Sequence, residues 1–221
     1  MALPTRPQAV IFDCDGVLVD SEPITNAVLR DMLNEQGLDF NLARTMTTFV
    51  GRSVKDSIPE IEGWIGRTLP PDWHPEFVRR RDEALAREVG PVDGIDAVIR
   101  QLIRNDMPFA VASGADRPKM RLTLGRSGLL EHFAQRMFGS DMVARTKPAP
   151  DVYLLAMRTL GLDPARVVVV EDTPTGTRAG VAAGATVYGL AGHMPAEQLR
   201  AAGAALTFTA MRELPALLAL D

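Results

Sequence analysis

The sequence has few residues that could cross-link the chain or bind a metal through sulfur or nitrogen. Cys14 is the only cysteine, so no disulfide can form within the chain. We expect Cys14 to be buried filler in a protein of the reducing cytoplasm. The three histidines, His74, His132 and His193, are scattered and lack the spacing of metal ligands. We assign them no role.

The chain also lacks an excess of positive charge and any long apolar run. It carries 24 lysine and arginine residues against 28 aspartate and glutamate residues, for a net charge of −4. That balance does not favour a nucleic acid or an anionic membrane as a partner. No apolar run approaches the roughly 18 residues of a transmembrane helix, and residues 1–8 lack the apolar core of a signal peptide. We therefore expect a soluble cytoplasmic protein.

The stretch VIFDCDGVLVDS, residues 10–21, holds the first candidate functional residues. A short apolar run is followed at once by Asp13, Asp15 and Gly16. On an extended backbone the two aspartates lie on the same side, roughly 6–7 Å apart at their Cα atoms. One can then act as a nucleophile or metal ligand and the other as a proton carrier. Taken alone, this stretch would be interpreted as a strand followed by an acidic turn.

Residues 21–90 contain no convincing strand. Ser21 is a plausible N-cap for a first helix, and a second helix is expected over residues 42–49. Ser53 is expected to cap a third helix over residues 54–61, and a charged fourth helix should follow over residues 75–88. We predict a small all-helical domain inserted after the first strand.

From residue 91 the pattern changes to strands that alternate with helices. Apolar, β-branched runs predict strands near residues 109–112, 136–138, 167–170, 186–188 and 206–208. The run at 167–170 is four consecutive valines, which is typical of a strand buried on both faces. Alternation of this kind predicts a doubly wound parallel α/β sheet, built from residues 1–20 and 91–221.

Polar residues follow several of these predicted strands. Ser113 follows one, Glu171 and Asp172 follow the valine run, and Lys147 stands just before a predicted helix. Lys147 or Ser113 alone would be an ordinary surface or turn residue. Paired acids at the end of a core strand are unfavourable unless something neutralises them.

Four motifs in order give the sequence a family resemblance. They are DCDGVLVDSE (13–22), VASG (111–114), KPAPDVY (147–153) and VVVVEDTPTG (167–176). On these motifs the chain resembles the haloacid dehalogenase superfamily, in the branch that includes β-phosphoglucomutase and small sugar-phosphate phosphatases. The resemblance covers nearly the whole chain and implies a Rossmann-like core, with the helical insert as the family's cap domain. The family often has a cis peptide bond before the matching proline, so the resemblance implies one between Lys147 and Pro148.

The resemblance implies a role for each matched residue. Asp13 would attack phosphorus, and Asp15 would protonate the leaving oxygen and later take a proton from water. Lys147 and Ser113 would contact the phosphate, and so would the backbone N–H groups of Gly16 and Gly114. Mg²⁺ would be the cofactor. Its implied ligands are Asp13, the Asp15 carbonyl and Asp172, with Glu171 as a ligand or close beside it.

The choice within the family depends on Asp15 and on the insert. Dehalogenation leaves no alkoxide to protonate, so the presence of Asp15 favours phosphate chemistry. β-Phosphoglucomutases carry a histidine and an arginine where this chain has Thr25 and Val54. We therefore prefer a phosphatase acting on a small sugar or sugar-acid phosphate. A mutase is the alternative, and a phosphonatase using Lys55 or a non-catalytic binding module is more remote.

Residues that could select the substrate are expected in the cap and in the loops facing it. The candidates are Gly51, Arg52, Ser53, Lys55, Arg80, Asp116 and Arg117. Arg52 is preferred because it adjoins Gly51, in the loop expected to close over the site. Each could also be a solvated surface side chain. No coiled-coil heptad or apolar patch is visible, so we expect a monomer.

Overall fold

The computed structural model describes residues 6–220, and the chain divides into two compact units. One unit contains the chain up to Asp20 and again from Gly90 onward, and the other is Ser21–Val89. Gly90 therefore lies with the first unit and not with the helical segment expected over residues 21–90. That the two units act as a catalytic core and a substrate-selecting cap stays a prediction.

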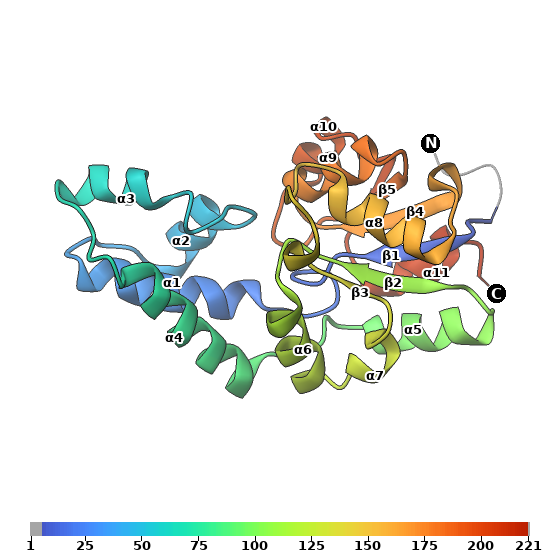
Figure 1. The fold of residues 1–221 in the computed structure, drawn as a ribbon, viewed down its shortest axis with the longest axis horizontal. Helices are drawn as coiled ribbons and strands as arrows, with labels where there is room; N and C mark the ends of the chain where they lie inside the picture. The colour runs from blue at the N-terminus through green and yellow to red at the C-terminus, as the bar shows by residue number, and fades with distance from the viewer. Residues whose placement is uncertain (1–5, 221) are drawn as a thin grey trace. The chain divides into compact units, whose positions relative to one another are not determined.

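The first unit is built on a six-stranded parallel sheet with the order β3-β2-β1-β4-β5-β6 (Figure 1). The strands are β1 (Ala9–Phe12), β2 (Phe109–Ala112), β3 (Met137–Phe138), β4 (Val167–Glu171), β5 (Thr186–Leu190) and β6 (Leu206–Phe208). Strands β1 and β4 are buried along their whole length, as apolar runs in the middle of a parallel sheet should be.

Helices cover both faces of this sheet. They are α5 (Ile95–Arg104), α6 (Arg117–Arg126), α7 (Leu130–Phe133), α8 (Asp151–Leu160), α9 (Pro174–Ala182), α10 (Ala196–Ala201) and α11 (Leu214–Leu217). On one face α9 packs against α8 and α10, and on the other α5 packs against α11 and α6 against α7 (Figure 1). The predicted doubly wound parallel α/β fold is confirmed.

The order of the strands places a switch point between β1 and β4. From β1 the chain proceeds outward to β2 and β3, and it then returns to β4 on the other side of β1 before continuing to β5 and β6. In open α/β sheets, the loops that leave neighbouring strands in opposite directions open a crevice at the carboxyl edge. The residues just after β1 and β4 are therefore the ones to examine for function.

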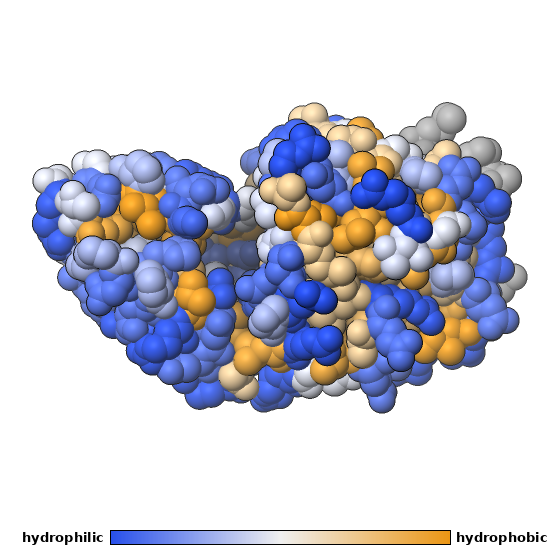
Figure 2. All heavy atoms as spheres, viewed as in Figure 1, coloured by the Kyte–Doolittle hydropathy of each residue, from blue (hydrophilic) through white to orange (hydrophobic). Residues whose placement is uncertain are grey.

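The second unit consists of four helices: α1 (Glu22–Glu35), α2 (Leu42–Phe49), α3 (Ile58–Ile65) and α4 (Trp73–Glu88). Helix α1 packs against α2 and α4. The second unit has an apolar core of its own, which includes Leu33, Phe49, Ile61, Trp73 and Phe77. Figure 2 shows mainly hydrophilic side chains on the visible face of these helices, with smaller apolar areas between them.

Two helix predictions were wrong in their limits. The third helix begins at Ile58 and not at residue 54, because the Ser53 hydroxyl accepts a hydrogen bond from the Asp56 N–H within a turn. The last predicted helix, over residues 212–220, is a 3₁₀ turn at Met211–Glu213 followed by the single helical turn α11. The short helix α7 was not predicted.

Within residues 6–220, every helix is too short or too polar to cross a membrane.

Candidate active site

The carboxyl ends of β1 and β4 bring acidic residues together at the switch point. Asp13 directly follows β1, and its backbone N–H donates to the Val170 carbonyl of β4 across 3.0 Å. Glu171 is the last residue of β4 and Asp172 follows it. Neighbouring parallel strands therefore hold these residues side by side, although they are about 160 positions apart in the sequence.

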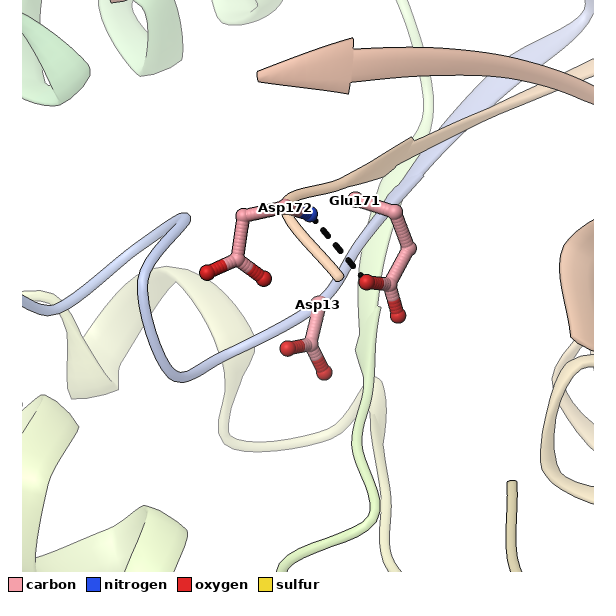
Figure 3. Close-up of side chains that lie close together, drawn as sticks. All are labelled: Asp13, Glu171 and Asp172. Atoms are coloured by element: carbon pink, nitrogen blue, oxygen red, sulfur yellow. Dashed lines mark hydrogen bonds between the residues drawn. The ribbon is translucent and has the colours of Figure 1, made fainter. Parts of the chain in front are cut away.

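Asp13, Glu171 and Asp172 form a buried carboxylate cluster. One carboxylate oxygen from each lies within 4.8 Å of the others, and Figure 3 shows the three side chains on the same side of the strand ends. The Asp172 N–H donates to Glu171 Oε2 at 3.1 Å. The Thr173 N–H and hydroxyl donate to the same oxygen at 3.2 and 3.1 Å. These bonds fix the Glu171 carboxylate.

Lys147 joins two members of the carboxylate cluster. Its Nζ atom donates to Asp13 Oδ1 and to Glu171 Oε1, at 2.7 Å in each case. Lys147 is followed by a cis bond to Pro148, as the resemblance implied. The Tyr153 hydroxyl, from the buried face of α8, donates to Glu171 Oε1 at 2.8 Å. Tyr153 was missed by sequence reasoning, although a buried tyrosine generally needs a partner for its hydroxyl.

Asp15 has a lysine partner of its own. The Nζ atom of Lys119, in the first turn of α6, donates to Asp15 Oδ2 at 2.8 Å. Sequence reasoning missed Lys119, because nothing in the basic composition of this helix marks one residue as facing Asp15. The site thus pairs lysines with carboxylates twice, at Asp13 and at Asp15.

Burial and neighbouring charge shift the pKa values of the buried groups. Burial raises the pKa of Asp13 to about 7, while Lys147 opposes this rise and the charges of Glu171 and Asp15 add to it. Burial alone would lower the pKa of Lys147, but Asp13 and Glu171 hold it well above its usual value. Burial also raises the pKa of Tyr153, so its phenol stays protonated and can donate to Glu171. Lys147 is therefore a permanent cation, whereas the charge of Asp13 depends on the cations around it.

The carboxylate cluster fits a divalent cation. Three buried carboxylates face one buried lysine, and carboxylate oxygens are the ligands that Mg²⁺ prefers. An excess of buried negative charge is unfavourable unless a cation neutralises it. Two glycines allow the carboxylates to lie where they do. A Cβ atom at Gly16, where φ is +77°, would overlap the Asp172 carboxylate, and one at Gly176 would overlap that of Glu171.

Ser113 follows β2, next to β1 on the side away from β4. It is buried, its N–H donates to the Phe138 carbonyl at 3.0 Å, and its hydroxyl accepts from the Ala115 N–H at 3.1 Å. Gly114 follows it, and a Cβ atom there would meet nothing within 4 Å. Both residues thus lie at the same sheet edge as Asp13, and their predicted contacts with phosphate stay predictions.

The other candidate substrate residues lie in the second unit or at the start of α6. Gly51, Arg52, Ser53 and Lys55 belong to the segment between α2 and α3, and Arg80 belongs to α4. The Arg52 guanidinium pairs with Glu60, and that of Arg80 pairs with Glu35 and Glu76.

In the first unit, Arg117 pairs with Asp141 at 2.7 Å, and the Asp116 side chain caps α6. Cys14 is buried, as expected. Burial, with the charges of Asp15 and Asp13, raises the pKa of its thiol, which stays protonated and suits the role of filler.

A doubly wound parallel sheet with buried acidic residues at its carboxyl edge is the arrangement found in α/β enzymes. The family model for haloacid dehalogenase-like hydrolases matches residues 7–184. The chain belongs to the haloacid dehalogenase-like hydrolase family, and the family predicted from the four motifs is confirmed.

Known proteins resemble the chain over most of its length. Hexitol phosphatase A from Escherichia coli (strain K12) is 31% identical over 198 residues, covering 88% of this chain and 87% of that protein. A fructose-1-phosphate phosphatase from the same organism is 30% identical over 183 residues, covering 81% and 94%. The crystal structure of a haloacid dehalogenase family hydrolase from Deinococcus radiodurans R1, with bound phosphate and sodium, has a TM-score of 0.83 at 36% identity and covers 97% and 96%.

Proposed function

We propose that the protein is a Mg²⁺-dependent phosphatase that hydrolyses the monoester of a small phosphorylated sugar or sugar acid. The single observation that carries this proposal is the position of Asp13. It is buried at the switch point, hydrogen-bonded to Lys147 and within 4.8 Å of Glu171 and Asp172, with Asp15 two residues further on. The names of the relatives support the same class, since two similar proteins are a hexitol phosphatase and a fructose-1-phosphate phosphatase.

Asp13 and Asp15 divide the two half-reactions. An Asp13 carboxylate oxygen attacks phosphorus, the bond from phosphorus to the ester oxygen breaks, and Asp15 gives its proton to the leaving alkoxide. The product of this step is an aspartyl-phosphate on Asp13. Asp15 then takes a proton from a water molecule whose oxygen attacks the same phosphorus. The bond between phosphorus and the Asp13 oxygen breaks, inorganic phosphate leaves, and both aspartates return to their starting states.

The remaining residues handle charge. Lys147 keeps its proton and balances the Asp13 carboxylate as negative charge builds on the phosphoryl oxygens. Ser113 and the backbone N–H groups of Gly16 and Gly114 are suited to bind those oxygens. Asp13, Asp172 and the Asp15 carbonyl would hold Mg²⁺, with Glu171 beside it. The metal supplies positive charge that neutralises the cluster and lowers the pKa of Asp13.

The sugar-phosphate class rests on the relatives, and the preference for hydrolysis over mutase chemistry rests on the insert. Thr25 and Val54 stand where β-phosphoglucomutases have a histidine and an arginine. A mutase must hold a bisphosphate and keep water out, whereas a phosphatase needs one phosphate and access for water.

The test is phosphate release from a panel of hexitol, sugar and sugar-acid monophosphates with Mg²⁺. Asp13→Asn serves as the blank, because it keeps the shape of the side chain but removes the nucleophile. We expect release that stops with the variant and with a chelator. Appreciable turnover by Asp13→Asn would contradict the nucleophile assignment.

The panel also includes β-glucose 1-phosphate with a trace of the bisphosphate. Isomerised product without phosphate release would replace the phosphatase by the mutase. If no compound gave inorganic phosphate or an isomerised product, the protein would be a non-catalytic binding module.

A further inference from the structure

Lys119 reaches the site from a part of the chain that none of the four motifs covers. Its Nζ atom lies 2.8 Å from Asp15 Oδ2, across 104 positions of sequence. The two side chains are 14% and 18% exposed, so the pair is largely removed from water. A hydrogen bond from a charged donor in such surroundings is stronger and better oriented than one on an open surface.

Two hydrogen bonds within α6 order the backbone of Lys119, and a third contact joins this helix to the loop after β1. Asp116 caps the start of α6, because its side chain accepts a hydrogen bond from the backbone N–H of Lys119 at 2.9 Å. One turn later, the buried Thr123 hydroxyl donates to the Lys119 carbonyl at 3.1 Å. Thr123 Oγ1 also lies 3.9 Å from the sulfur of Cys14, the residue before Asp15. Thr123 thus connects the backbone of Lys119 to the residue next to Asp15.

Helix stability does not explain a lysine at this position. The N-terminal turn of a helix carries partial positive charge and favours acidic side chains, yet the first turn of α6 has none. Holding a long lysine side chain in one conformation also costs entropy. A cation placed against the helix dipole and hydrogen-bonded to the Asp15 carboxylate points to a task at that carboxylate.

We propose that Lys119 is a positioning residue for Asp15. By holding Oδ2, it fixes the rotamer of Asp15 and so the path along which the Asp15 proton reaches the leaving oxygen as the phosphorus–oxygen bond breaks. Proton transfer depends steeply on this geometry, because a misplacement of about 1 Å can lower a rate by about 100-fold. The inference rests on the proposed role of Asp15 as the general acid.

The first test compares two substrates in the variant Lys119→Met. A sugar phosphate needs a proton on its leaving alkoxide, whereas p-nitrophenyl phosphate has a leaving group that is stable as an anion. We expect the single-turnover rate of alcohol release from the sugar phosphate to fall about 10- to 100-fold with KM within about threefold, and that of p-nitrophenol release to fall less than about threefold. This rate reports only the half-reaction in which Asp15 acts as the acid. A purely structural role would lower both rates equally.

Two control variants separate position from charge and from folding. Lys119→Arg keeps a cationic donor, so its rate on the sugar phosphate should be at least several-fold higher than that of Lys119→Met. Arg121→Met removes an exposed cation from the same helix and should leave the rates on both substrates unchanged. Thermal denaturation and Mg²⁺ binding of each variant check that the fold and the metal site are intact.

The second test repeats Lys119→Met in the background Asp15→Asn. If Lys119 acts through Asp15, the second substitution should lower the residual rate by less than about twofold. Equal losses on the two substrates, a rise in KM at unchanged kcat, or a full loss in the Asp15→Asn background would overturn the inference. No turnover by the wild type would overturn the proposed function as well, whereas full turnover by Lys119→Met would overturn the positioning role alone.

Discussion

Charged side chains pair in two different ways in the two units. At the edge of the sheet, Lys147 is 8% exposed and joins Asp13 and Glu171, which come from two different strand ends. In the second unit, Arg79 is 54% exposed and pairs with Glu76 and Glu83, three and four residues away on the same helix. The first arrangement needs the whole fold, and the second needs only one helix.

The difference shows what each kind of pair is for. Exposed pairs at helical spacing contribute little to stability and form wherever the spacing allows. Buried pairs lose the hydration of their charges, and apolar side chains of similar volume are often at least as stable in their place. The carboxylate cluster is therefore poorly explained by stability and well explained by a need to bind a cation and to react. Substitutions in the two regions should separate these effects.

Asp172→Ala should have the largest effect, because it removes one of the proposed metal ligands. We expect turnover to fall at least about 1,000-fold and Mg²⁺ affinity at least about 100-fold. A ligand that binds only the folded state raises the melting temperature, so Mg²⁺ should raise that of the wild type but not that of the variant. Thermal denaturation across a Mg²⁺ titration measures this.

The control for Asp172→Ala is Glu131→Gln, which removes an exposed acid from the same unit. It should keep both the turnover and the Mg²⁺-dependent rise in melting temperature. An undiminished rise in Asp172→Ala would move the metal site away from the carboxylate cluster.

Tyr153→Phe should have an intermediate effect. The substitution removes the donor at 2.8 Å from Glu171 Oε1 without changing the packed ring. Loss of one hydrogen bond to a charged group destabilises a protein by at most about 3 kcal/mol, and Lys147 still donates to the same oxygen. Disturbing a residue beside a metal lowers affinity or activity about 10- to 100-fold. Urea denaturation and initial rates at several Mg²⁺ concentrations measure the two effects.

The other tyrosine of the chain provides a matched control. Tyr188, on β5, is also buried, but its hydroxyl donates to the Leu217 carbonyl at 3.5 Å. Tyr188→Phe should leave turnover unchanged. If both variants lowered turnover alike, the loss would come from packing and not from the position of Glu171.

The parts predicted from sequence are those that depend on strong local patterns. The apolar runs at β1 and β4 are long and continuous, so the parallel sheet and the acids at its edge followed from them. The family motifs then identified Ser113 and Lys147, which local pattern alone would leave as surface or turn residues.

The parts that were missed depend on how helices pack. Lys119 and Tyr153 each reach a carboxylate from a helix, and the rotation of a helix against a sheet is not encoded by spacing alone. The start of α3 was wrong for a related reason. Ser53 and Ser57 are both plausible caps, and the turn closed by the Ser53 hydroxyl decides between them.

The smallest effects are expected in the second unit, where two arginines can be compared. Arg80 and Arg52 are similarly exposed, at 36% and 44%, and each pairs with glutamate in the same unit. Arg80 is the less favoured candidate for selecting the substrate. If it serves only as an exposed ion pair, Arg80→Ala should shift the melting temperature by less than about 2 °C and leave substrate preference unchanged, because exposed ion pairs add little. Arg52 adjoins Gly51 in the segment proposed to select the substrate, so Arg52→Ala should change the ratio of rates on two sugar phosphates by a few fold at an unchanged rate on p-nitrophenyl phosphate. Initial rates on the two sugar phosphates and on p-nitrophenyl phosphate, measured for both arginine variants, test these expectations. An unchanged ratio in Arg52→Ala would reduce Arg52 to another exposed pair and move substrate selection elsewhere in the chain.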